Sequence, residues 1–128
     1  MTLHQDLLEA ALRIADSAYA PYSSFHVGAA IRSASGNIYT GCNVENASYG
    51  LSICAERSAV AQMISAGERT ISAICVASDG GVTPCGACRQ VLIEFGEDFS
   101  VLLVDRHSRQ LERVWQINEL LPGAFRLQ

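Results

Sequence analysis

The sequence predicts an α/β fold: a three-layer α/β/α arrangement with a five-stranded mixed sheet between helices. Segments with helical periodicity alternate with short apolar segments along the 128 residues. Two apolar segments, 71–77 and 100–104, lack regular polar alternation, as expected of strands that are covered on both faces. The length is typical of one domain, so we expect residues 1–128 to form a single domain.

The first part of the chain carries the signals for one helix and a pair of strands. Apolar residues at helical spacing predict a helix from residue 3 to about 18, ending before Pro21. Segments 27–33 and 38–44 are predicted to be strands, because the sequence Ala-Ser-Gly-Asn at 34–37 between them favours a turn. We therefore expect a β-hairpin after the first helix.

The rest of the chain is predicted to alternate helices with strands. Two helices are expected, at 54–66 and 86–95, and each is followed by a glycine that favours a helix end. The other expected elements are strands at 71–77, 100–104 and near 111–114, and a turn of helix at 117–121. Because strands and helices alternate, crossover connections and a mixed sheet are expected.

Composition narrows the possible functions. The net charge of −4 disfavours a nucleic-acid partner, because contact with many phosphates needs a basic surface. All nine basic residues are arginine, which excludes lysine Schiff bases, pyridoxal phosphate chemistry and the Walker A loop. The apolar runs are far shorter than the roughly 18 residues of a membrane span. No secretory signal is visible, and five cysteines, an odd number, favour a reduced, cytoplasmic chain.

Two cysteine motifs together supply three thiols and one carboxylate. They are Cys54-Ala55-Glu56-Arg57 and Pro84-Cys85-Gly86-Ala87-Cys88. Structural zinc is normally held by four Cys or His ligands, whereas catalytic zinc keeps three and leaves one position for water. The thiols lie at the starts of two predicted helices, where the helix dipole stabilises thiolates. The motifs therefore predict an open catalytic zinc site with Glu56 as its proton carrier.

Arg57 has a predicted part in the charge balance of this site. Three thiolates and one Zn²⁺ carry a net charge of about −1, which weakens the metal as an acid. Arg57 follows Cys54 by three residues, so its guanidinium can reach back along the same helical face. We expect it to donate to the zinc thiolates from outside the ligand shell. The alternative is an ordinary exposed arginine.

Other interpretations of the cysteines remain open. Cys85 and Cys88 form a C-x-x-C motif, which is also the redox motif of thioredoxin-like proteins. A closed structural zinc site would need a fourth ligand, for which Cys42, Cys75 and His26 are the candidates. Glu56 alone could simply complement a helix dipole. Metal analysis separates these interpretations, because a tightly bound zinc ion and a reversible disulfide exclude one another.

Blocks of sequence beyond the cysteine motifs resemble the zinc-dependent cytidine deaminases of the short, homotetrameric class. These blocks are 20–23, Phe25, 27–30, 43–50, 84–90 and 120–125. Cys54 stands where the longer, dimeric class has His. The resemblance implies a cytidine deaminase-like fold, one zinc per subunit, and hydrolysis of cytidine and 2′-deoxycytidine to uridine and 2′-deoxyuridine with ammonia release, in pyrimidine salvage. The nearest alternative is deamination of a related nucleoside such as blasticidin S.

The resemblance also implies roles for individual residues. Cys54, Cys85 and Cys88 would bind zinc, and Glu56 would shuttle protons. The residues implied to hold the nucleoside are Phe25, Asn43, Val44, Glu45 and Ala55, with Asn43 and Glu45 on the ribose hydroxyls. Ala47, Tyr49 and Phe125 would reach the site of a neighbouring subunit in the homotetramer. His26 replaces a small or apolar residue of the family, and no role is assigned to it.

Overall fold

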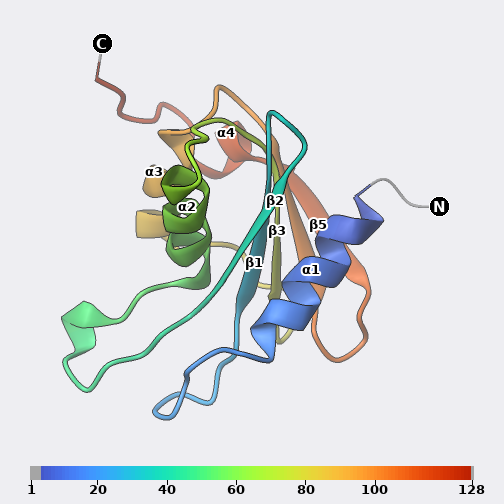
Figure 1. Cartoon of the computed structure of the whole chain (residues 1–128), viewed down its shortest axis with the longest axis vertical. Coiled ribbons are helices and arrows are strands. Elements are labelled where there is room, and N and C mark those ends of the chain that lie inside the picture. The colour runs from blue at the N-terminus through green and yellow to red at the C-terminus, as the bar shows by residue number, and fades with distance from the viewer. Residues whose placement is uncertain (1–3, 128) are drawn as a thin grey trace.

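A single mixed sheet forms the centre of the computed structural model, which describes residues 4–127 (Figure 1). Its strands are, in spatial order, β2 (Ile38–Cys42), β1 (Gly28–Ser33), β3 (Ile71–Ser78), β4 (Ser100–Asp105) and β5 (Leu111–Gln116). β3 and β4 are parallel, and every other neighbouring pair is antiparallel. The predicted five-stranded mixed sheet is therefore confirmed.

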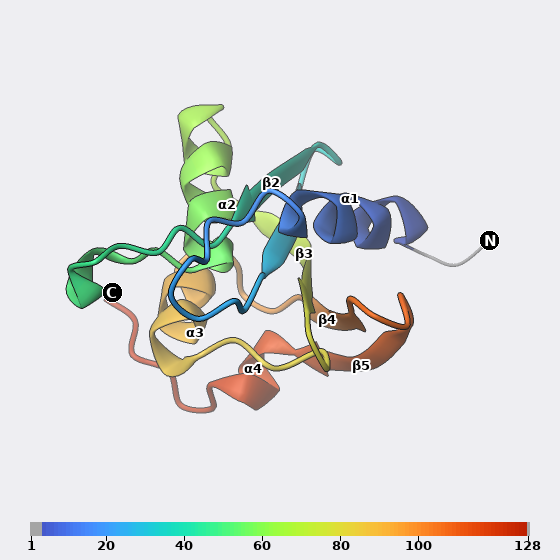
Figure 2. The same cartoon turned by 90° about the horizontal axis from the view of Figure 1, so that it is seen from below.

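Helices cover both faces of this sheet (Figure 2). α1 (Gln5–Ala15) packs on one face, and α2 (Ala55–Ser65), α3 (Gly86–Ile93) and the short α4 (Ile117–Leu120) pack on the other. β3 shows the division directly, because Ile74 and Val76 belong to the core under α2 and α3, whereas Cys75 belongs to the core under α1. Successive side chains of a strand point to opposite faces, so a strand buried on both sides has the continuous apolar sequence observed here.

Small residues let α1 lie close to the sheet. A Cβ atom on Gly28 would lie 2.2 Å from the backbone oxygen of Ala11, which no side chain can do without a shift of the backbone. Ala30, Ala73 and Cys75 continue the same small surface on β1 and β3. The N-terminal helix is thus fixed against the strands by glycine and alanine.

The observed elements differ from the predicted ones mainly at their ends. The first helix ends at Ala15 instead of residue 18, and residue 3 lies outside the described range. The second strand ends at Cys42, because Val44 leaves β1 and forms isolated bridges with Tyr19 and Ile53. The third helix ends at Ile93, two residues earlier than expected, and β5 continues to Gln116 because it pairs with β4 to that point. End differences of one or two residues are normal for helices.

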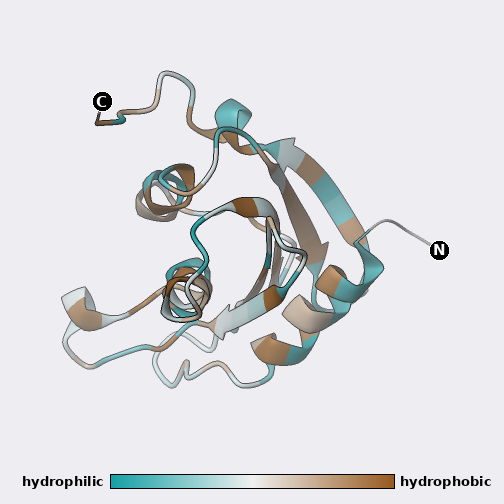
Figure 3. Cartoon of the chain, turned by 45° about the horizontal axis from the view of Figure 1, so that its top comes forward, coloured by the Kyte–Doolittle hydropathy of each residue, from teal (hydrophilic) through white to brown (hydrophobic). Residues whose placement is uncertain are grey.

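The segment between β2 and α2 projects from the body of the molecule as an arm, residues 43–53 (Figure 1). It contains a 3₁₀ turn, η1 (Tyr49–Leu51), and hydrophobic residues lie on it (Figure 3). Tyr49 is 92% exposed and Leu51 66% exposed.

Within residues 4–127, no helix combines the length and the apolar character needed to cross a membrane.

Candidate active site

Three cysteines meet where α2 and α3 begin. Cys54 is the residue that caps the N-terminus of α2, Cys85 caps α3, and Cys88 lies in the first turn of α3. Their sulfur atoms all lie within 4.8 Å of one another. The three cysteines come together because α2 and α3 pack side by side on one face of the sheet. Two motifs that are distant in sequence therefore form one cluster.

The electrostatic environment favours thiolates in this cluster. The N-termini of two helices direct partial positive charge towards the sulfur atoms. A hydrogen bond from Cys88, with a further one from Arg57, lowers the pKa of Cys54 to about 5. The same hydrogen bond and burial raise the pKa of Cys88, because both favour its protonated form. Binding of a metal ion by thiolates releases the protons that the thiols still carry.

The cluster fits a zinc ion with three protein ligands. Tetrahedral zinc with Zn–S bonds of about 2.3 Å needs sulfur atoms about 3.8 Å apart, which the mutual separations allow. Among the candidates for a fourth ligand, Cys75 lies in the core on the opposite face of the sheet, where burial raises its pKa to about 12. Cys42 and His26 are not part of the ligand cluster that the described residues form. A zinc ion held by these three cysteines would keep one position for water.

Glu56 lies next to the cysteines in the first turn of α2. The residue is only 5% exposed. Burial raises the pKa of its carboxyl to about 7, and the negative charge of Cys54 adds to this effect. A carboxyl group with this pKa gains and loses a proton near neutral pH, as a general acid and base must. Simple complementation of the helix dipole would favour an exposed, ionised glutamate instead.

A cavity of about 780 Å³ opens over Glu56. Most of the predicted site residues line it: Phe25, Asn43, Glu45, Ala47, Tyr49, Cys54, Ala55, Glu56, Arg57 and Cys85. Three others do not. Cys88 is buried behind the lining, Val44 bridges Tyr19 and Ile53, and Phe125 is 69% exposed on the C-terminal segment. The Nδ1 atom of His26 is buried and makes no hydrogen bond within residues 4–127.

One wall of the cavity is built by Asn43 and Glu45, which hold the loop at residues 22–27. The Asn43 side chain accepts a hydrogen bond from the Val27 N–H at 2.9 Å and donates one to the Phe25 carbonyl at 2.9 Å. An amide side chain has two donors and two acceptor positions, so these bonds use half of its capacity. One N–H and one lone pair of Asn43 therefore remain to serve a ligand.

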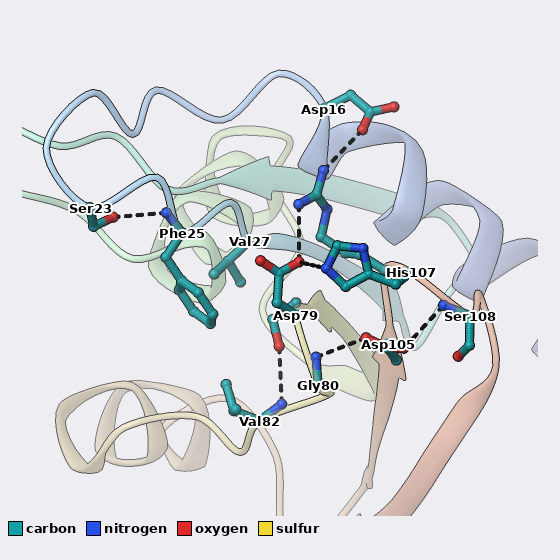
Figure 4. Close-up of polar contacts among 12 residues, drawn as sticks. Asp16, Ser23, Phe25, Val27, Asp79, Gly80, Val82, Asp105, His107 and Ser108 are labelled. Atoms are coloured by element: carbon teal, nitrogen blue, oxygen red, sulfur yellow. Dashed lines mark hydrogen bonds and ion pairs between the residues drawn. The ribbon is translucent and has the colours of Figure 1, made fainter.

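Glu45 is bound to the same loop through Ser23. Its Oε1 accepts from the N–H groups of Tyr22 and Ser23, at 3.0 and 3.2 Å, and its Oε2 accepts from the Ser23 hydroxyl. The bond from the Ser23 hydroxyl is the main cause of the lowered pKa of Glu45. Ser23 in turn accepts from the Phe25 N–H at 3.0 Å (Figure 4). Ser23 was not among the predicted site residues, although it belongs to a resembling block.

The opposite wall includes Val82, whose side chain points towards Phe25 from a different loop (Figure 4). Gly80, in the left-handed region with a φ of 84°, starts the turn that leads to Val82. The Gly80 N–H donates to Asp105 at 2.8 Å, and this bond is the main cause of a pKa of about 2 for Asp105. Asp79 adds an ion pair with Arg106 and lies 3.2 Å from Nε2 of His107. The pair of glycines was the only sequence signal for this turn.

Comparison with known proteins agrees with the geometry. The family model "Cytidine and deoxycytidylate deaminase zinc-binding region" matches residues 1–103. The probable cytidine deaminase of Dictyostelium discoideum is 46% identical over 92% of this chain and 80% of its own length. For a cytidine deaminase of Mycobacterium tuberculosis the identity is 47%, over 91% of this chain and 85% of the relative.

Solved structures share the fold over nearly the whole chain. The crystal structure of cytidine deaminase from Burkholderia pseudomallei has a TM-score of 0.89 and 46% identity, covering 97% of this chain and 100% of that one. The cytidine deaminase structure from M. tuberculosis has a TM-score of 0.83 and 40% identity, covering 99% and 100%. The family's defining region binds zinc, which confirms zinc as the metal of the cysteine cluster. This chain belongs to the cytidine and deoxycytidylate deaminase family.

Proposed function

We propose that this protein hydrolyses cytidine and 2′-deoxycytidine to uridine and 2′-deoxyuridine, with release of ammonia. One observation carries the proposal: two of the zinc-binding cysteines, the buried Glu56 and the polar pair Asn43 and Glu45 line the same cavity. Two relatives that are 46% and 47% identical to this chain over the aligned residues are named as a probable cytidine deaminase and a cytidine deaminase. The acidic net charge fits a small nucleoside better than a polynucleotide.

The chemistry assigns the proton transfers to Glu56. Cys54, Cys85 and Cys88 would hold the zinc ion, which would supply the Lewis acid that activates a water molecule as the nucleophile. Glu56 takes a proton from this water and passes it to N3 of the cytosine ring as the oxygen adds to C4. It then carries the proton of the new C4 hydroxyl to the amine, which leaves as ammonia when the C4–N bond breaks and the C4=O bond forms. A carboxyl with a pKa of about 7 suits both directions of transfer.

The cavity walls supply the groups that would orient a nucleoside. Phe25 and Val82 offer apolar surface to the pyrimidine ring, while Asn43 and Glu45 offer polar atoms to the ribose hydroxyls. A backbone contact between Ala55 and the base is supported by the position of this residue at the start of α2, in the lining of the cavity. Val44 would act indirectly, since its bridges with Tyr19 and Ile53 hold the arm in place.

Assembly into a homotetramer with shared active sites is also proposed. Tyr49 and Phe125 are large aromatic residues that are 92% and 69% exposed, and such surfaces usually mark an interface. Phe125 does not line the cavity of its own chain within the described residues, which fits a role in a neighbour's cavity. Ala47 and Tyr49 line the rim and would meet the neighbouring subunit there. A cytoplasmic location fits the five free cysteines, three of which must stay reduced to bind zinc.

An ammonia-release assay tests the proposed activity. Purified protein would be mixed with cytidine, with 2′-deoxycytidine and with blasticidin S, each with and without prior treatment with a zinc chelator. We expect ammonia from the first two substrates, and its loss after chelation, restored by added zinc. Release from blasticidin S alone would transfer the proposal to that nucleoside. Equal turnover after complete zinc removal would contradict the mechanism.

A further inference from the structure

Arg89 makes three directed hydrogen bonds beside the zinc site. Its Nε donates to the Pro84 carbonyl at 2.8 Å, its Nη1 donates to the Leu120 carbonyl at 2.8 Å, and its Nη2 donates to the Thr83 hydroxyl at 3.1 Å. Every nitrogen of the guanidinium is therefore used. An arginine held in this way by two backbone carbonyls has a fixed orientation, because its donors are arranged in a rigid plane.

The segment that Arg89 holds leads directly into a zinc ligand. Thr83 and Pro84 precede Cys85, which is exposed, whereas Cys88 is buried in the first turn of α3. The loop before them contains Gly80 and Gly81, both in the left-handed region. Helix and core packing thus fix Cys88, while the position of Cys85 depends on a glycine-containing loop. Arg89 fastens the last two residues of that loop to α3.

The bond from Arg89 to the Leu120 carbonyl reaches the C-terminal part of the chain. Leu120 is the last residue of α4, and the chain then runs past α3 (Figure 2). Two other contacts attach this C-terminal segment to α3: Gln90 donates to the Phe125 carbonyl at 3.1 Å, and Arg126 donates to the Ile93 carbonyl at 2.8 Å. Of the three side chains Arg89, Gln90 and Arg126, only Arg89 also binds Thr83 and Pro84, the residues that precede Cys85.

We propose that Arg89 is a positioning residue of the zinc site, which keeps Cys85 at bonding distance from the metal and couples this loop to the end of α4. Metal–sulfur distances tolerate deviations of only about 0.2 Å, so a small drift of the Thr83–Pro84 segment is enough to weaken the Cys85 bond. Removal of Arg89 would also leave the Pro84 and Leu120 carbonyls without their donor. The inference rests on the zinc site of the proposed function, but not on the identity of the substrate.

Cobalt spectroscopy and zinc release would test this role in the full-length holoprotein. Arg89→Ala should release zinc to a chelator about 10–100-fold faster, the usual effect of losing an outer-shell support. Its cobalt-substituted form should show altered thiolate-to-metal and ligand-field absorption, because one sulfur moves. Arg89→Lys should lie between Arg89→Ala and the wild type, since an amine replaces only part of the three-donor geometry. In cytidine assays the loss should fall mainly on kcat.

Arg126→Ala is the matched control, because it removes an arginine bond between α3 and the C-terminal segment without touching the metal loop. We expect it to lower the melting temperature while the cobalt spectrum and zinc release stay as in the wild type. If Arg89→Ala and Arg126→Ala destabilise alike and both keep wild-type metal properties, Arg89 has only a structural role. Should Arg89→Ala not fold, a wild-type spectrum and zinc release in Arg89→Lys would overturn the proposal. These metal measurements need no substrate, so a failed cytidine assay would leave their outcome intact.

Discussion

The Nη2 atom of Arg57 lies 3.6 Å from the Sγ atom of Cys54, the residue that precedes α2. The contact brings a cation to a cluster that otherwise accumulates negative charge, since three thiolates outweigh one Zn²⁺. The positive ends of α2 and α3 act in the same direction. In this chain the arginine and the two helix ends would offset the excess negative charge of an all-cysteine zinc site, a charge that neutral histidine ligands would not create.

Replacing Arg57 with alanine should raise the pKa of the Cys54 thiol in the metal-free protein. The guanidinium stabilises the thiolate by a hydrogen bond and by its charge, and both effects disappear with the side chain. Ultraviolet absorbance of the thiolate as a function of pH would measure the change. Zinc should also be lost faster, and the acidic limb of the pH–activity profile should move to higher pH. Arg57→Lys keeps the charge, so the pKa of Cys54 should shift less in this variant. An unchanged Cys54 titration in Arg57→Ala would mean that Arg57 is an ordinary exposed arginine with no effect on the thiolate.

Glu56→Gln should keep zinc but lose activity by about 10²- to 10⁴-fold, the usual contribution of a general acid and base. The amide is nearly the same size as the carboxyl but carries no transferable proton at neutral pH, so the buried position can still be filled. Steady-state kinetics with parallel metal analysis would measure both properties. Glu94→Gln, at an exposed glutamate just after α3, is the matched control and should behave as the wild type. Near-normal turnover in Glu56→Gln would remove the glutamate from the mechanism.

The sheet could be predicted from the sequence because its evidence is local. The apolar segment at 73–77 follows from burial on both faces, and the hairpin follows from its turn residues. The cysteine cluster could also be predicted, because the metal restricts which residue types and helix positions can serve it. In both cases the physical requirement is visible within a few residues of sequence.

The supports of the site are different, because they join residues that are distant in sequence. Ser23 lies 22 residues from Glu45, and Arg89 lies 31 residues from Leu120. Neither contact has a local pattern, since a serine in a loop or an arginine in a helix is usually just exposed. The departure of Val44 from β2 likewise depends on Tyr19 and Ile53, which a search for strand periodicity does not include.

Ser23→Ala should raise KM for cytidine about two- to tenfold, with a smaller change in kcat. The hydroxyl donates to Glu45 and accepts from the Phe25 N–H, so its loss frees two residues of the proposed nucleoside wall at once. Ser23→Thr retains the hydroxyl and should restore most of the affinity. The comparison is made at saturating and at low cytidine concentrations. If the two variants have the same KM as the wild type, the backbone bonds of Glu45 and the bonds of Asn43 hold the wall without the Ser23 hydroxyl.

Phe125→Ala should raise KM for cytidine by up to about tenfold, or weaken the oligomer, if this residue closes the cavity of a neighbour. The ring is exposed in the single chain, so its loss should change the melting temperature of an isolated subunit very little. Light scattering and kinetics on the same samples would separate assembly from substrate binding. Leu127→Ala removes another exposed apolar side chain of the same segment and serves as the control. Wild-type kinetics in an intact oligomer would show that Phe125 only packs.

Glu68 should make the stability of the fold depend on acid pH. Hydrogen bonds from Ser35 and Tyr39, with smaller ones from Ser33 and Asn37, lower the pKa of its carboxyl to about 2. A carboxyl whose pKa is lowered by folding stabilises the protein above the ordinary value of about 4.5, and this contribution is lost as the pH falls towards 2. Glu68→Gln should therefore have a lower melting temperature than the wild type at neutral pH. This difference in melting temperature should disappear as the pH falls from about 4.5 to about 2.

Thermal unfolding of metal-free protein between pH 7 and pH 2 would measure this gap without interference from zinc loss. Tyr39→Phe is the graded control, because it removes one donor to Glu68 and leaves the carboxylate in place. Its gap from the wild type should be smaller than that of Glu68→Gln and should close over the same range. A gap in melting temperature that stays constant with pH would mean that Glu68 contributes through packing and not through its charge, because only an ionisable group can make the difference depend on protons.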